Sequence, residues 1–301
     1  MTTLVIGANG LVGSRIVARL AEAGEQVVAS SRGTSRLEAA VRGRVKYLPL
    51  DMMQEPSRVP ELIGLTRPDG VINAAAMTDV DGCERSPSHA WVLNAAIVDL
   101  AAKAAAQYRA RFTHLSTDYV FDGAKGSYSE EDAPNPRSVY ARSKRAGEEA
   151  ALIAAKDVAV CRVAVVYSGR RGAKNTFAVT VADSLRAGKP VKAFTDQVVS
   201  PTLADNAAEM VIGVHRSGAQ GLFHCAGATE VSRLDFCRAL ARKLGADESL
   251  IVPVQLADLQ LPAPRPLKCG LRVDKLKQLL GESVPLPLED ALDRFLEERR
   301  G

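Results

Sequence analysis

Two side chains suited to acid–base chemistry, Tyr140 and Lys144, stand four positions apart near the middle of the chain. Residues at that spacing lie on one face of a helix, so a phenol and an ammonium can share a cavity. A nearby cation stabilises phenolate and brings the phenol pKa, ordinarily about 10, closer to neutrality. Upstream, an apolar segment ends in Ser116 and Thr117, which can add a hydroxyl. This trio suits hydride transfer to a carbonyl, with Thr117 as a second hydrogen-bond donor.

The Tyr-x-x-x-Lys spacing alone is weak evidence, because two fixed positions recur by chance in many helices. The alternative is a half-buried tyrosine beside a lysine whose methylene chain covers apolar surface. The segments that precede Tyr140 favour the catalytic interpretation, since they contain the glycine-rich turn and the strand ends that a nicotinamide dinucleotide site requires.

A glycine-rich turn follows the first apolar segment, residues 3–6, and precedes an amphipathic segment that ends near Ala23. Glycines at such a turn let the backbone bend sharply, approach a pyrophosphate and bring the helix close to the strand. The spacing is G-x-x-G-x-x-G, which could also be simple turn punctuation. Placed after a strand, the turn predicts a dinucleotide site whose cofactor contacts are Gly7, Asn9, Gly10, Leu11, Val12 and Gly13.

The second expected strand, residues 26–30, ends in Ser31 and Arg32. At this point an NAD-binding site usually carries Asp or Glu for the ribose diol. A guanidinium suits a ribose 2′-phosphate instead, because its planar fork makes charge-assisted contacts. NADPH is therefore the expected cofactor, NADH remains possible, and a solvated surface arginine is the alternative for Arg32.

Further strands are expected over residues 45–50, 70–73 and 111–115, with helical segments between them. This alternation predicts βαβ units and a parallel sheet with right-handed crossovers. Ligands of such sheets bind at the carboxyl ends of the strands. The fold class is therefore α/β, a Rossmann-type doubly wound parallel sheet. The strand ends add cofactor candidates Asp51, Met52, Ala74, Ala75, Ala76 and Ser116, and the helix expected over residues 87–108 adds Asn94.

Composition narrows the class of protein. The 301 residues are 47% hydrophobic and 25% charged, with a net charge of +4, which is ordinary globular composition. No basic run with interleaved aromatics suggests a nucleic-acid partner, and no apolar run suggests a membrane span. The five cysteines are scattered and never in C-x-x-C spacing, so no disulfide framework or metal site is expected. We expect a cytoplasmic protein.

The chain resembles the extended short-chain dehydrogenase/reductases and, within them, the dTDP-4-dehydrorhamnose reductase group. The resemblance spans nearly the whole chain and is most specific in the block Ser-Thr-Asp-Tyr-Val-Phe, residues 116–121. It continues in Tyr140 to Lys144, in Asp196-Gln197 and in Ser200-Pro201-Thr202. In that family the residue matching Thr117 orients the carbonyl. The residue matching Tyr140 protonates the new alkoxide. The residue matching Lys144 binds the nicotinamide ribose and lowers the pKa of that phenol.

The resemblance implies a nucleotide-sugar substrate whose 4-keto group is reduced. The candidate substrate contacts are Thr78, Val80, Asp118, Phe121, Asn175 and Arg265, with Arg265 the candidate for the diphosphate. Asp118 could equally be a loop hydrogen-bonding residue. The basic loop over residues 169–175 could close over the diphosphate, or could be simply exposed.

Three departures from the family pattern concern the sugar pocket and the catalytic helix. Ala141 replaces the glycine that usually follows the catalytic tyrosine, and Val165 stands where many rhamnose-forming members have a tryptophan that packs on the sugar. The segment 196–200 lacks a glycine common in the family. The reductase chemistry is therefore expected to be intact and the sugar pocket altered.

The sequence predicts a cofactor-binding domain over residues 1–167, with the helix at 203–216 packing back on it, and a smaller C-terminal α/β substrate-binding region over 168–301. The last helical segments could form a homodimer. Two alternatives remain open for function: another sugar-nucleotide reductase or epimerase, or a non-catalytic partner such as the regulatory subunit of methionine adenosyltransferase, because fold alone does not fix function.

Overall fold

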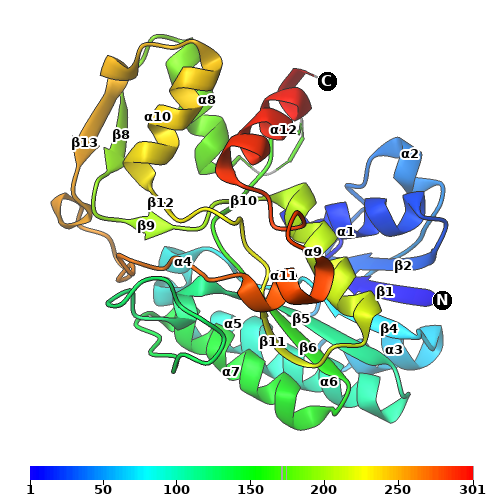
Figure 1. The fold of residues 1–301 in the computed structure, drawn as a ribbon. Coiled ribbons are helices and arrows are strands. Elements are labelled where there is room, and N and C mark those ends of the chain that lie inside the picture. Colours follow the sequence, from blue (N-terminus) through cyan, green and yellow to red (C-terminus); the bar gives the residue numbers. More distant parts are fainter. Residues whose placement is uncertain (171, 174, 301) are drawn as a thin grey trace.

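The computed structural model describes residues 1–170, 172–173 and 175–300. Figure 1 shows a larger part built on a parallel sheet and a smaller part above it. The smaller part contains the helices α8 (Phe177–Arg186), α10 (Arg233–Leu244) and α12 (Leu288–Arg300). None of the helices in these ranges combines the length and apolar content needed to cross a membrane.

Within the described residues, seven parallel strands form the central sheet in the order β11-β6-β5-β4-β1-β2-β3. They are Thr2–Ile6 (β1), Gln26–Ser31 (β2), Lys46–Pro49 (β3), Gly70–Asn73 (β4), Arg111–Thr117 (β5), Val158–Val163 (β6) and Gly221–His224 (β11). The predicted Rossmann-type doubly wound sheet is confirmed. The strand order reverses between β1 and β4, which pair directly, so the ligand crevice is expected at the carboxyl ends of these two strands.

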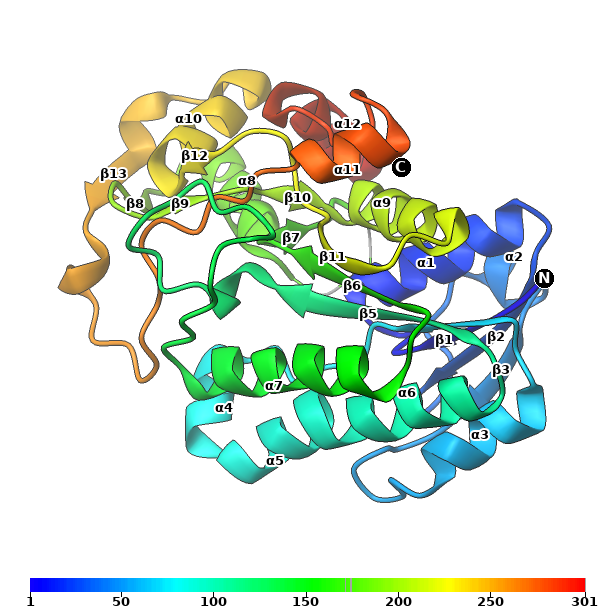
Figure 2. The same ribbon diagram turned by 60° about the horizontal axis from the view of Figure 1, so that its bottom comes forward.

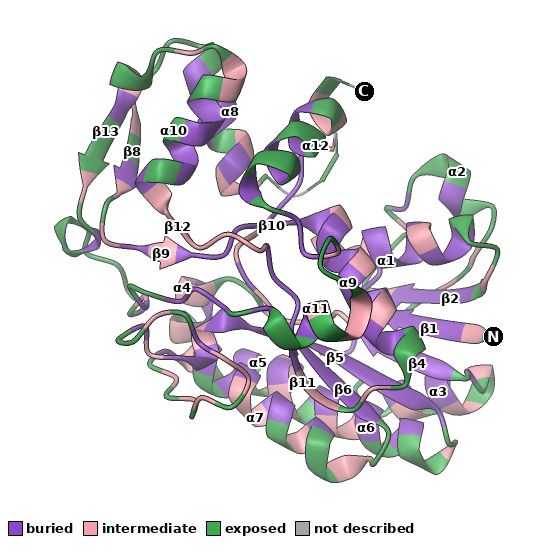
Figure 3. Cartoon of the chain, in the orientation of Figure 1, coloured by how far each residue is buried: buried purple, intermediate pink, exposed green. Residues whose placement is uncertain are grey.

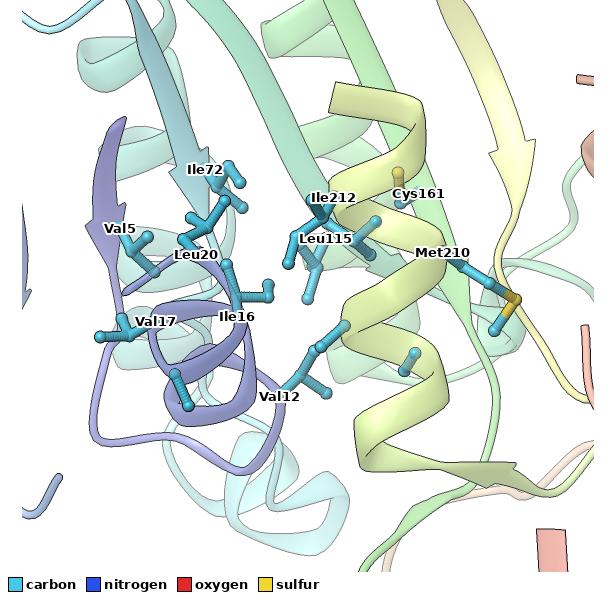
Figure 4. Packing of buried hydrophobic residues seen from close by; sticks show 14 of the residues in the cluster. Val5, Val12, Ile16, Val17, Leu20, Ile72, Leu115, Cys161, Met210 and Ile212 are labelled. Atoms are coloured by element: carbon cyan, nitrogen blue, oxygen red, sulfur yellow. The ribbon is translucent and has the colours of Figure 1, made fainter. Parts of the chain in front are cut away.

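Helices cover both faces of the sheet (Figure 2). One face carries α3 (Arg58–Thr66), α6 (Ile97–Gln107) and α7 (Val139–Ala154), and the other carries α1 (Leu11–Glu22) and α9 (Ala204–Ser217). Because helices cover both sides of the sheet, the central strands β4 and β5 are buried along their whole length, although β5 includes polar residues such as Arg111 and His114. Figure 4 shows the core on one face, where side chains of α1 and α9 pack with Ile72 and Leu115 of the sheet.

The segment expected as one helix over residues 87–108 is interrupted. It consists of α5 (Pro87–Trp91), a π-helical turn (Val92–Ala96) and α6. The side chain of Asn94 in this turn accepts from Met77 N at 2.8 Å and donates to Ser143 Oγ at 3.0 Å. Gly147 of α7 lies so close that a Cβ there would be 2.1 Å from the Asn94 carbonyl oxygen. The widened turn thus accommodates the close approach of α7 and the anchoring of Asn94.

The smaller part has short strand pairs and its own core. β8 (Val191–Phe194) pairs in parallel with β13 (Ile251–Val254), and β9 (Val198–Val199) pairs antiparallel with β12 (Val231–Ser232). Tyr167 packs edge-on against Phe236 and Phe295, with ring centroids 5.5 and 5.6 Å away. Figure 3 shows this core as buried residues along α8 and α10, separate from the almost wholly buried central sheet.

The two parts are connected more often than a division at residue 167 implies. β7 (Val166–Tyr167) pairs with β10 (Thr202–Leu203) just before the chain enters α9. β11 then joins the central sheet beside β6, and α11 (Asp274–Leu280) packs on α9 and β11. The sequence division assigned residues 221–224 and 274–280 to the substrate-binding region. They lie in the larger part, because β11 pairs with the outer edge of β6.

The remaining elements are short. They are α2 (Ala39–Arg42), α4 (Val80–Arg85), and 3₁₀ turns at Asp118–Val120, Glu248–Leu250 and Leu256–Asp258. All five cysteines are buried free thiols. Among the described residues, no group of three His, Cys, Asp or Glu side chains is arranged to hold a metal ion.

Candidate active site

Two adjoining cavities lie at the carboxyl ends of the central strands. The first has a volume of about 530 Å³ and the second about 410 Å³. Gly10, Ala74 and Ala76 line both, so the two cavities form one trough across the point where the strand order reverses. Of the other predicted site residues, Gly7, Ser31, Arg32, Asp51, Met52 and Ala75 line the first cavity, and Leu11, Val12, Thr78, Val80, Ser116, Thr117, Asp118, Tyr140 and Lys144 line the second.

The glycine turn forms the floor of the first cavity. Gly7 has a φ of +85°, and a Cβ on it would lie 2.6 Å from the backbone nitrogen of Ala75, so glycine is required there. A Cβ on Gly13 would lie 2.2 Å from the Gly7 carbonyl oxygen, so Gly13 acts in packing and lines neither cavity. Helix α1 begins at this turn, and its first turn contains no acidic residue. Its N-terminus is therefore suited to an anionic group such as a pyrophosphate.

The side chain of Asn9 anchors the loop that follows β2. Its Nδ2 donates to the carbonyl oxygens of Arg32 at 3.2 Å and Thr34 at 3.0 Å, and its Oδ1 accepts from Arg36 N at 2.9 Å. Asn9 was predicted as a cofactor contact, but its side chain shapes the loop after β2 and lines neither cavity. Arg32 is exposed at the rim of the first cavity, and no ion pair joins it to a carboxylate in the described ranges.

The three predicted catalytic residues meet in the second cavity. Thr117 ends β5, while Tyr140 and Lys144 lie one turn apart on α7, which begins at the Ser138 cap. Lys144 Nζ donates to the Leu115 carbonyl oxygen at 2.6 Å and lies 3.3 Å from His114 Nε2. The Thr117 hydroxyl donates to Asp118 Oδ1 at 2.9 Å and accepts from Tyr119 N at 3.2 Å.

Burial dominates the electrostatics of this group. Burial raises the pKa of Tyr140 well above its ordinary value, and a hydrogen bond with Thr117 works in the opposite direction. Burial also lowers the pKa of Lys144 to about 8, while the negative charge of Glu148 raises it. Tyr140 is therefore a neutral phenol at neutral pH, which is the form that donates a proton.

The substrate side of the second cavity combines polar and aliphatic groups. Burial raises the pKa of Asp118 to about 7, while its bond with Thr117 and the charge of Arg233 lower it. Asp118 Oδ2 is buried and has no hydrogen-bond partner in the described part of the chain. Val165 has a φ of +42°, a left-handed conformation that is strained for a β-branched residue. Val165 lines the second cavity, at the position that the sequence analysis matched to a tryptophan of many rhamnose-forming members.

Besides Asn9 and Gly13, four predicted residues lie away from both cavities. Asn94 is fully buried behind the wall and ties Met77 to Ser143. Phe121 is buried too, and its ring stacks on Tyr128 with centroids 4.1 Å apart. Asn94 is held by hydrogen bonds and Phe121 by ring stacking, so neither side chain is free to contact a ligand. The spacing of residues in the sequence does not reveal such contacts.

Arg265 and Asn175 also lie outside the lining. Arg265 Nη2 is 2.9 Å from Asp81 Oδ2, and Asn175 is exposed, with its Oδ1 3.5 Å from Thr180 Oγ1. In the basic loop, Arg170 is near Glu38 and Glu298, at 3.5 and 3.7 Å. Arg171 and Lys174 of that loop fall outside the described residues.

The sequence reasoning missed Arg233, which lines the second cavity from the first position of α10. It also missed Tyr119, whose ring meets that of Tyr140 edge-on at 5.9 Å, and the wall residues Val163 and Val166. The only available signal for Arg233 was its position after the cap residue Ser232, which does not indicate a site.

Comparison with known proteins connects this geometry to a family. The sequence matches the family described as RmlD substrate binding domain over residues 1–300. The chain belongs to this family. The predicted resemblance is therefore confirmed over the whole length of the described structure.

Relatives of this RmlD family member include named reductases. The probable low-salt glycan biosynthesis reductase Agl14 of Haloferax volcanii is 37% identical, over 97% of this chain and 96% of its own. The dTDP-4-dehydrorhamnose reductase of Mycobacterium tuberculosis is 36% identical, over 87% and 82%. The crystal structure of a hypothetical dTDP-4-dehydrorhamnose reductase from Sulfolobus tokodaii is 31% identical, covers 97% of this chain and 99% of its own, and has a TM-score of 0.82.

Proposed function

We propose that this RmlD family member reduces the 4-keto group of a nucleotide-activated deoxysugar with hydride from NADPH. The observation that supports this most directly is the meeting of Thr117, Tyr140 and Lys144 in a cavity that continues into the glycine-turn cavity. A carbonyl in the second cavity would face a phenol and a hydroxyl, beside a site shaped for a dinucleotide.

In the proposed reaction Tyr140 supplies the proton. Its hydroxyl hydrogen goes to the carbonyl oxygen as that oxygen gains negative charge. Thr117, whose hydroxyl donates to Asp118 in the absence of substrate, turns that hydroxyl to the same oxygen, since Thr117 and Tyr140 line the same cavity. Lys144, with a pKa of about 8, is available to return a proton to the Tyr140 phenolate.

The cofactor preference rests on the first cavity. NADPH supplies the hydride when it is bound. The steric requirement for glycine at Gly7 and the acid-free N-terminus of α1 fit a pyrophosphate. Arg32 is exposed at the rim and pairs with no carboxylate among the residues that the structure describes, so it fits a ribose 2′-phosphate better than a ribose diol. NADH remains a weaker alternative cofactor in this proposal.

The substrate class is supported by the names of the relatives. The Mycobacterium tuberculosis relative is named for dTDP-4-dehydrorhamnose, and a Streptomyces niveus relative, 33% identical, is named dTDP-4-keto-6-deoxy-D-glucose reductase. Val165 offers the sugar an aliphatic side chain rather than an aromatic ring at this part of the cavity. We therefore propose the 4-keto-6-deoxyhexose class rather than one sugar, in a cytoplasmic homodimer without nucleic-acid or membrane partners.

The test is loss of NADPH absorbance with a dTDP-4-keto-6-deoxyhexose, run for the natural protein and for Tyr140→Phe. Removal of the phenolic proton should lower kcat by about 10²- to 10⁴-fold, while NADPH binding persists. Tyr108→Phe is the matched control, since Tyr108 ends α6 and lines neither cavity. A parallel assay with NADH measures the cofactor preference.

Near-normal turnover in Tyr140→Phe would contradict the mechanism. NADPH binding without turnover would instead favour another carbonyl substrate or a non-catalytic regulatory role. Tightly retained oxidised cofactor after purification would favour an epimerase.

A further inference from the structure

The second cavity has a cation on its substrate side that the catalytic scheme does not use. Of the described residues that line it, Lys144 and Arg233 are the two basic ones. Lys144 Nζ donates to the Leu115 carbonyl oxygen, lies 3.3 Å from His114 Nε2, and is already assigned to Tyr140 in the proposed reaction. We propose that Arg233 binds the diphosphate of the nucleotide-activated substrate, a role that the sequence assigned to Arg265. The identity of this ligand rests on the proposed function.

The Arg233 side chain is held by two neighbours, Gln197 and the Phe177 ring. Its Nε donates to Gln197 Oε1 at 3.1 Å, and Gln197 Nε2 in turn donates to the Pro266 carbonyl oxygen at 3.2 Å. The guanidinium carbon lies 4.7 Å from the centre of the Phe177 ring. These contacts orient the guanidinium but occupy only one of its three nitrogens. Neither terminal Nη has a hydrogen-bond partner in the part of the chain that the structure describes.

The charge of Arg233 is also uncompensated. No carboxylate lies within ion-pair distance of it among residues 1–170, 172–173 and 175–300, and burial lowers its pKa. Tyr119 and Asp118 are the acidic groups that act most strongly on the pKa of Arg233, and burial raises the pKa of Asp118 to about 7. A partly buried guanidinium without a partner is costly, because the charge has lost water without gaining an anion. An anion that arrives with the substrate removes this cost.

Phosphate is the anion that best fits this position. A nucleotide-activated sugar has its diphosphate at one end of the sugar ring, and the reacting carbonyl belongs near Thr117 and Tyr140. Arg233 belongs to the smaller part of the protein, at the start of α10, whereas Thr117 and Tyr140 belong to the larger part. All three line the same cavity. Two vacant Nη groups in one plane can each donate to a phosphate oxygen.

Arg265 is a poor candidate by the same criteria. One of its Nη atoms is 2.9 Å from Asp81 Oδ2 and the other donates to the Ala263 carbonyl oxygen at 3.1 Å. Arg265 is therefore already neutralised, and it lines neither cavity. To bind a phosphate it would first have to break the pair with Asp81.

The experiment is calorimetric titration of dTDP, UDP and thymidine into the NADP-saturated protein. Charge-assisted bonds of this kind correspond to a loss of about 10- to 100-fold in affinity for the diphosphates in Arg233→Gln. Thymidine affinity, NADP affinity and the melting temperature should stay unchanged. Arg265→Gln is the matched control and should change dTDP affinity less than threefold. Arg233→Lys, which keeps the charge, should recover part of the loss.

Equal dTDP affinity in Arg233→Gln and the natural protein would overturn the proposal, as would a larger loss in Arg265→Gln. A parallel loss of thymidine affinity would also overturn it, by showing that the site has merely distorted. Arg233-dependent binding of dTDP without reduction of any keto sugar would refute the proposed function and leave this inference standing.

Discussion

Replacing Glu148 by Gln should strongly destabilise the protein, because it leaves a buried guanidinium without its counterion. Glu148 and Arg162 both have fully buried side chains, joined by bonds of 2.8 and 2.7 Å, and Arg145 adds a third at 2.9 Å. Removing one member of a buried ion pair costs about 3–5 kcal/mol. The glutamine retains the shape of the side chain, so this cost reflects the lost charge rather than a cavity.

Urea denaturation followed by circular dichroism measures the effect. With an m value of about 3 kcal/mol/M, the midpoint should fall by roughly 1 to 1.7 M. Glu55→Gln is the matched control, since the Glu55–Arg58 pair has side chains 46% and 52% exposed and should contribute less than about 1 kcal/mol. A double change, Glu148→Leu with Arg162→Met, should recover much of the loss, because neither charge then remains buried.

The same variant has a second consequence at the active site. Glu148 is the negative charge that raises the pKa of Lys144, so its removal should lower that pKa further below about 8. The alkaline limit of the pH–rate profile should therefore move to lower pH. Equal urea midpoints for Glu148→Gln and Glu55→Gln would refute the argument, since they would mean that Arg162 needs no buried counterion.

Two further predictions concern the glycine turn and the buried histidines. Gly7→Ala places a Cβ 2.6 Å from Ala75 N at a φ of +85°, so NADPH affinity should fall at least about tenfold in a fluorescence titration. Gly188→Ala, at φ +64° with open space around it, should cost about 1 kcal/mol and leave that affinity unchanged. Burial lowers the pKa of His215 to about 4 and of His224 to about 3. Because both pKa values are depressed from about 6.5, stability is full above that pH and should fall as the pH drops towards 4. Urea midpoints measured from pH 7 to 4.5 test this, and His215→Gln should flatten the slope; an unchanged slope in that variant would exclude His215 as its source.

The sheet and the glycine turn could be predicted because they depend on local order. Apolar strands followed by glycine, small or hydroxyl residues specify a parallel sheet, and parallel strands bring Gly7, Ala74 and Thr117 to the same edge. No long-range information was needed for that step. The catalytic trio was accessible for the same reason, since Tyr140 and Lys144 share one helical face.

Residues beyond that edge could not be assigned from spacing. Whether a side chain lines a cavity or supports its wall depends on its neighbours in space. Asn94 accepts a hydrogen bond from Met77, and Phe121 stacks on Tyr128, so neither side chain lines a cavity. Arg233 reaches the cavity only because Gln197, Pro266 and Phe177 from other segments orient it. Arg265 suits a diphosphate by residue type, but its pairing with Asp81 joins segments far apart in the sequence and cannot be read from spacing.

The repeated crossing of the chain between the two parts determines how the protein can be divided. A fragment ending at residue 167 would lack β11, leaving the backbone of β6 as an unprotected edge strand. It would also lack α9, leaving Ile16 and other apolar side chains of α1 exposed to water. Such a fragment should self-associate rather than bind NADPH, although it contains every predicted contact for that cofactor. The cofactor-binding domain therefore cannot be excised by cutting the chain at one place. A fusion or a circular permutation should keep β11 and α9 together with residues 1–167.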